Sequence, residues 1–114
     1  MSEKIKEQID RTISNLCDEE YQSSVWLGKV PGNFDSAIEC YCTIRDDIPV
    51  SRDLLISLGY DEEVIEIYIT IVNTLDEHFK RFPFPDSDDE LLSSDEWKQV
   101  RKKIKELLSA LKRA

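Results

Sequence analysis

Residues 61–82 read DEEVIEIYITIVNTLDEHFKRF, and this stretch decides the fold because it fits two secondary structures. Apolar side chains recur with helical spacing from Val64 to Phe82. A competing alternation of β-branched side chains favours a strand, and it comprises Ile65, Ile67, Ile69 and Ile71. No turn signal interrupts the stretch, which is far longer than a typical strand. We therefore predict one long central helix, buried on most sides, with a strand over 64–72 as the alternative.

The segment 37–45 has the same ambiguity. Its apolar residues alternate as in a strand, but Ser36 and Glu39 have the spacing of a capping box at the start of a helix. The capping box favours a helix there as well. The prediction for the chain is an all-α fold, a compact bundle of about five helices; the alternative is an α+β fold with strands near 37–45 and 64–72.

Helical patterns on either side complete the bundle. An apolar stripe predicts an N-terminal helix, and it consists of Ile5, Ile9, Ile13, Leu16 and Cys17. A second stripe predicts a C-terminal helix that Ser94 begins, and it consists of Trp97, Val100, Ile104, Leu107, Leu108 and Leu111. Short helices are expected over 21–27 and from Ser51 to Gly59. Residues 86–96 read as an acidic linker or a single helical turn.

A chain of 114 residues with only 3 glycines and 4 prolines suits a single helical domain, 1–114. No apolar run approaches the roughly 20 residues that span a bilayer, so we expect no membrane contact. The N-terminal sequence MSEKIKEQIDR lacks the apolar stretch of a secretory signal, which predicts a cytoplasmic protein with reduced cysteines. We expect a monomer, or a weak homodimer formed through Trp26 or the Trp97 helix.

The net charge of −9 is unevenly distributed along the chain. Residues 17–97 hold 20 acidic and 5 basic residues, whereas residues 98–114 hold 1 acidic and 7 basic ones. An acidic body repels phosphate backbones, so we expect no direct contact with nucleic acid. The basic segment follows the polarity that a helix dipole prefers, with acids at its start and bases at its end. A basic protein is therefore the natural partner of the acidic body.

Partner-binding residues are predicted where acidic clusters adjoin aromatic side chains that look exposed. Carboxylates attract a basic surface, and aromatic side chains anchor it. The candidates are Asp46, Asp47, Tyr60, Asp61, Glu62, Glu63, Phe84, Asp86, Asp88, Asp89 and Glu90.

The sequence contains none of the common catalytic motifs. His78 is the only histidine and has no local partner, so we expect it at the surface or at the boundary of the core. Cys40, Cys42 and the distant Cys17 lack the spacing of zinc motifs and are expected to pack in the core. We predict a non-enzymatic protein with no metal and no cofactor.

One segment carries a family resemblance, through Cys42, Ile44-Arg45, Pro49, Asp53-Leu54-Leu55 and Leu58-Gly59. Around these residues, over about 37–75, the chain resembles the small helical immunity proteins that bacteria carry beside contact-dependent or colicin-type toxins. The spacing between Arg45 and Pro49 departs from the family pattern, so no functional residue is carried over. The resemblance implies a dedicated inhibitor that masks the active site of a basic, nuclease-type toxin.

Two other functions remain open on the residues alone. A helical adaptor or regulatory subunit would bind through an apolar groove with little dependence on salt. An enzyme would need a pocket assembled from inconspicuous residues, with strongly perturbed carboxylates.

Overall fold

The computed structural model describes residues 2–32 and 35–113, with the side chains of residues 2, 112 and 113 left aside. Within these ranges the chain is 76% helical and has no strand, which confirms the all-α prediction. In chain order the elements are α1 (Ser2–Asn15), α2 (Glu19–Tyr21), the π-helical turn η1 (Gln22–Trp26), α3 (Ala37–Cys42), the π-helical turn η2 (Thr43–Asp47), α4 (Arg52–Ser57), α5 (Glu62–Arg81), α6 (Asp88–Ser93) and α7 (Asp95–Arg113).

The alternative with strands near 37–45 and 64–72 is wrong, because both segments are helical. In α5 the side chains with helical spacing are buried: Ile65, Tyr68, Ile71, Val72, Leu75, His78 and Phe79. The other isoleucines of the alternating pattern, Ile67 and Ile69, are half-buried. A helix enclosed on most sides can carry apolar residues in either pattern, so the strand-like alternation has no structural counterpart.

Serine side chains begin four of the helices. The Oγ atoms of Ser36, Ser51, Ser87 and Ser94 each accept a hydrogen bond of 3.2 Å from the backbone N–H three residues later. These bonds satisfy donors that a helix start leaves free. They confirm the predicted starts at Ser36, Ser51 and Ser94. The bond from Ser87 shows that the segment expected to be a linker or a single turn contains a capped short helix, α6.

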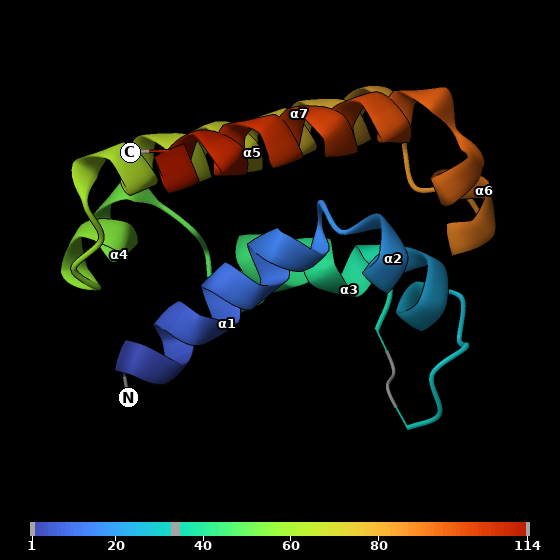
Figure 1. The fold of residues 1–114 in the computed structure, drawn as a ribbon, viewed down its shortest axis with the longest axis horizontal. Coiled ribbons are helices and arrows are strands. Elements are labelled where there is room, and N and C mark those ends of the chain that lie inside the picture. The colour runs from blue at the N-terminus through green and yellow to red at the C-terminus, as the bar shows by residue number, and fades with distance from the viewer. Residues whose placement is uncertain (1, 33–34, 114) are drawn as a thin grey trace.

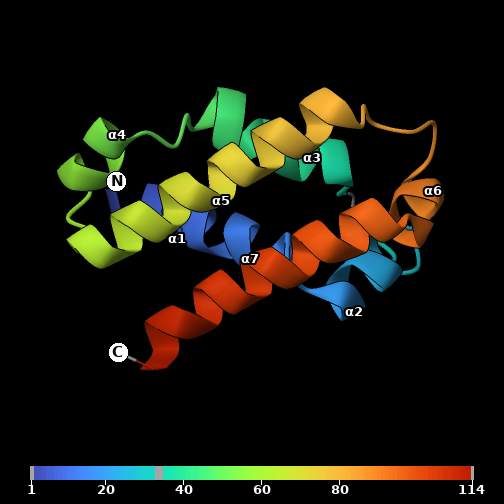
Figure 2. The same cartoon turned by 90° about the horizontal axis from the view of Figure 1, so that it is seen from above.

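The helices form two layers, with short helices at both ends of the molecule. Figure 1 shows α5 and α7 side by side in one layer, and α1 and α3 in the other. Figure 2, seen from above, shows that α5 and α7 run antiparallel, with α6 joining them at one end and α4 preceding α5 at the other. No helix in the part of the chain described here is both long and apolar enough to cross a membrane.

Aromatic rings fill the core between the layers. The ring of Trp97 lies 6.1 Å from that of Trp26 and 5.7 Å from that of Phe79, measured between centroids. Trp97 is fully buried and Trp26 is 5% exposed. The Trp26 side chain is therefore not available to form the homodimer contact considered from the sequence, whereas a contact through the Trp97 helix stays a prediction.

A buried glutamine joins three parts of the chain. Gln22, which is fully buried, donates from Nε2 to the carbonyl oxygen of Asn15 at 2.9 Å. Its Oε1 accepts from Trp97 Nε1 and from Arg101 Nη1, each at 3.1 Å. A second nitrogen of Arg101 lies 3.6 Å from the carboxylate of Glu19. This network ties the end of α1 and the turn η1 to the core face of α7.

Candidate functional site

The predicted partner-binding residues do not form one patch. Asp46 and Asp47 lie at the end of η2, and Tyr60 to Glu63 lie at the start of α5. Phe84 to Glu90 precede and begin α6. The start of α5 and the whole of α6 occupy opposite ends of the molecule (Figure 1). A single flat partner therefore cannot cover all the candidates together.

The two aromatic candidates are half-buried, so the expectation that they are exposed is wrong. The ring of Phe84 stacks on Phe79 with 3.9 Å between centroids, which places it against the aromatic core. The hydroxyl of Tyr60 donates to Asp10 Oδ1 at 2.7 Å, and the ammonium of Lys6 lies 4.7 Å from its ring. Both side chains are engaged within the fold, so the partner-binding surface has to rest on the carboxylates.

All four tyrosines of the chain donate their hydroxyls to carboxylates, a feature that the sequence did not reveal. Tyr60 and Tyr68 share Asp10, while Tyr21 binds Asp35 and Tyr41 binds Asp76. Burial, and then the bonded carboxylate, raises the pKa of each hydroxyl, to about 12 for Tyr41. Asp10, Asp35 and Asp76 are thereby committed to the fold.

The structure brings a different set of acids together. The segments around α2, α6 and the start of α7 lie at the same end of the molecule in both views (Figures 1 and 2). We call the acidic side chains of these segments the acidic end: Asp18, Glu19, Glu20, Asp86, Asp88, Asp89, Glu90, Asp95 and Glu96. All are exposed except Asp88, which is half-buried.

Few cations neutralise the acidic end. Among the described side chains, the ion pairs within 4 Å are Arg52 with Glu66, at 2.6 Å, and Arg101 with Glu19, at 3.6 Å. Only the second belongs to the acidic end. Burial raises the pKa of Asp88 above its usual value, and the nearby Asp35 adds to the shift. Among the described side chains, eight of the nine carboxylates at this end thus have no cation within 4 Å.

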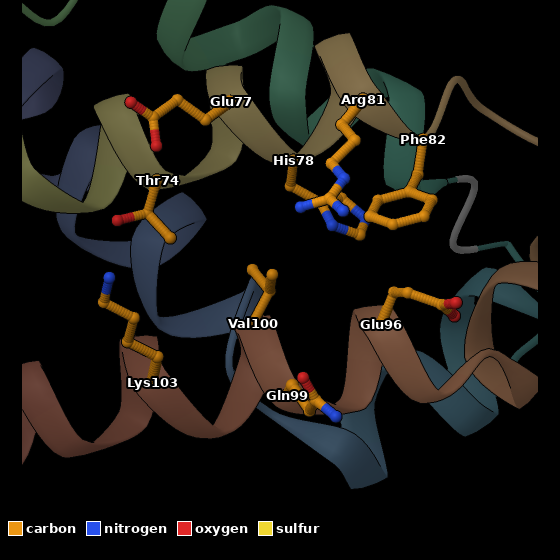
Figure 3. Close-up of a pocket in the computed structure, with 9 residues that line it drawn as sticks. All are labelled: Thr74, Glu77, His78, Arg81, Phe82, Glu96, Gln99, Val100 and Lys103. Atoms are coloured by element: carbon orange, nitrogen blue, oxygen red, sulfur yellow. The ribbon is translucent and has the colours of Figure 1, made fainter.

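A groove of about 520 Å³ lies between α5 and α7, with His78 in its wall (Figure 3). His78 is 6% exposed, so its predicted place at the surface or boundary is wrong: the spacing that puts Leu75 and Phe79 in the core also turns His78 inward. Its ring contacts those of Phe79, Phe82 and Trp97. Burial lowers the pKa of the imidazole, and Glu96 opposes the shift.

The groove contains the parts of a polar site without an assembled catalytic pair. The Nε2 atom of His78 is buried and has no hydrogen-bond partner among the described residues. Thr74, the hydroxyl nearest in sequence, donates to the carbonyl of Thr70 at 2.7 Å instead. A general base has to lie within hydrogen-bond reach of the proton that it removes. The side chains lining the groove show no such arrangement.

The cysteines are poorly suited to chemistry. Cys40 is buried, and its Sγ lies 3.0 Å from Asp35 Oδ2; burial and this carboxylate raise the pKa of the thiol. Burial and the neighbouring Asp46 also raise the pKa of Cys42. A thiol with a raised pKa is a weak nucleophile and a weak metal ligand at neutral pH. Only Cys40 is fully in the core, whereas Cys17 and Cys42 are half-buried, so the prediction of three core cysteines is too broad.

Comparison of the chain with known protein families, with curated proteins and with solved structures finds no match.

Proposed function

We propose that this protein is a non-enzymatic, acidic binding protein that acts by covering a basic surface of another protein. The observation that carries the proposal is the acidic end, where nine carboxylates gather and, of the side chains that the structure describes, a cation lies within 4 Å of Glu19 alone. Unpaired surface charge of one sign speeds encounters with an oppositely charged partner and selects against others. The proposal needs no catalytic group.

The most specific form of this proposal is an immunity protein in the cytoplasm of a bacterium, which masks the active site of a nuclease-type toxin. A nuclease binds phosphate through basic residues, so an acidic surface can occupy the same site. The observation in favour is again the acidic end, together with the resemblance between 37 and 75. The runner-up is a helical adaptor, for which binding would be largely independent of salt.

The first experiment isolates the partner. The protein is used to capture binding proteins from the cells that express it, and bound proteins are eluted with increasing salt. We expect a basic partner that leaves at moderate salt and whose nuclease activity falls when the protein is added back. A neutral partner that withstands high salt would contradict the proposal and favour the adaptor.

The second experiment tests where the partner binds. The triple variant Asp86→Asn, Asp89→Asn and Glu90→Gln removes three exposed charges from the acidic end and keeps the side-chain shapes. Exposed charges contribute about 0.5 kcal/mol each, so we expect binding about tenfold weaker. The matched control, Asp61→Asn, Glu62→Gln and Glu63→Gln, removes equal charge from the opposite end. Equal weakening in both variants would show that net charge matters and the acidic end does not.

A further inference from the structure

The C-terminal half of α7 is an amphipathic helix with an incompletely covered apolar stripe. Trp97 and Ile104, in its first half, are fully buried. Leu107, Leu108 and Leu111, in its second half, are only half-buried. Figure 2 shows why: α7 forms the edge of its layer, and α1 runs below α5 rather than below the last turns of α7.

A groove of about 630 Å³ lies beside this part of α7. Its apolar lining comes from Leu108 and Leu111 of α7, Tyr68 of α5 and Cys17 at the end of α1. Asp18 to Glu20, which follow α1 and begin α2, also line the groove. The groove thus combines apolar surface from three helices with a run of consecutive carboxylates.

The charges around the groove select its occupant. Asp18, Glu19 and Glu20 are exposed, and among the described side chains the one base in the lining is Lys105. Arg101 lies 3.6 Å from the carboxylate of Glu19, which stays largely exposed. An apolar side chain that enters such a groove is held best when basic residues flank it, because they meet the carboxylates at the rim.

We propose that this groove is the anchor point for the basic partner, and that it receives an apolar side chain flanked by lysine or arginine. This inference rests on the proposed function and adds where the partner binds and which kind of side chain makes the contact. The carboxylates of Asp18 to Glu20 belong both to the acidic end and to the groove, so a partner drawn to the acidic end meets the groove beside it. Charge then guides the encounter, and the apolar contact slows dissociation.

The test uses two fluorescein-labelled synthetic peptides and fluorescence anisotropy. One is a run of lysine and arginine with two central leucines, and the other has two central serines in their place. We expect the leucine peptide to bind about tenfold more tightly, because the groove buries one of its leucine side chains. Equal affinities would overturn the proposal that the groove binds an apolar side chain, and would leave the proposal of electrostatic binding standing. Binding of neither peptide would overturn both.

Two variants locate the contact. Leu108→Gln is expected to remove the preference for the leucine peptide while leaving the weaker binding of the serine peptide intact. The control Ile56→Gln changes a side chain on α4 that is 58% exposed and does not line the groove, and it should change neither affinity. A preference that survives Leu108→Gln would overturn the proposal.

A measurement on the unmodified protein covers the case in which Leu108→Gln does not fold. Methyl NMR spectra are recorded with each peptide added to the wild-type chain. The methyl signals of Leu108 and Leu111 should shift with the leucine peptide and stay in place with the serine peptide. Shifts confined to other leucines would overturn the proposal.

Discussion

Replacing Gln22 by methionine should destabilise the protein strongly even though the two side chains have similar volume. Gln22 is fully buried, and its Oε1 accepts two hydrogen bonds, from Trp97 and from Arg101. Methionine leaves both donors without that acceptor. The methionine side chain fills the same space, so the decrease in the free energy of unfolding measures the lost hydrogen bonds rather than the cost of a cavity.

The size of the loss follows from the burial of the two donors. The indole N–H of Trp97 is fully enclosed, and a buried donor without a partner costs about 1–3 kcal/mol. The guanidinium of Arg101 is also nearly enclosed but keeps the carboxylate of Glu19 nearby, so its cost lies near the lower limit. Together they give about 3 kcal/mol, which for a chain of this size lowers Tm by roughly 12 °C.

Chemical and thermal denaturation of the wild type, Gln22→Met and Gln99→Met measures the loss of stability. The matched control is Gln99→Met, which makes the same change at an exposed position of α7 and should alter stability by less than about 0.5 kcal/mol. A loss in Gln22→Met no larger than that in Gln99→Met would refute the reasoning. It would mean that the network joining α1, η1 and α7 does not contribute to stability.

Three further predictions concern single groups. Burial lowers the pKa of His78, so the unfolded chain binds a proton more readily than the folded chain. The free energy of unfolding should therefore fall as the pH drops through about 6.5. Denaturant titrations from neutral to mildly acidic pH should show that His78→Phe flattens this dependence. The pKa of Tyr41 is raised to about 12, first by burial and then by its bond to Asp76, so Asp76→Asn should shift one phenolate absorbance transition to lower pH; an unchanged titration would contradict this assignment. Gly59 has φ +83°, where a side chain is strained, so Gly59→Ala should cost about 1 kcal/mol in thermal unfolding although no atom lies within 4 Å of the added carbon.

The elements that the sequence could predict are those with strong local patterns. The start of α7 follows from Ser94, and the start and end of α4 follow from Ser51 and Gly59. Capping acts over three or four residues, so it can be seen in the sequence. The conflict in α5 was resolved by length rather than by pattern. Helix burial on most sides then explains why both patterns were present.

The features that the sequence could not predict depend on contacts between distant segments. Gln22 lies 75 residues from Trp97, and no local pattern marks a glutamine for the core. The bonds from Tyr60 and Tyr68 to Asp10 span 50 and 58 residues. The sequence also does not show which of its many carboxylates are structural, because nothing local distinguishes an acid that accepts a hydrogen bond from a tyrosine. The acidic end itself appears only once α2, α6 and α7 are placed together.

The crowding of acids at α6 argues that they are kept for binding rather than for stability. A helix dipole favours acids in the first turn, but α6 has only six residues and begins with Asp88, Asp89 and Glu90. A short helix has little dipole to offset three adjacent like charges. The variant Asp86→Asn, Asp89→Asn and Glu90→Gln should therefore unfold at a higher temperature than the wild type at low salt, while its binding weakens. Its advantage should shrink as salt screens the repulsion. If it is instead less stable than the wild type at every salt concentration, these carboxylates serve the fold, and the main argument for the acidic end as a binding surface is lost.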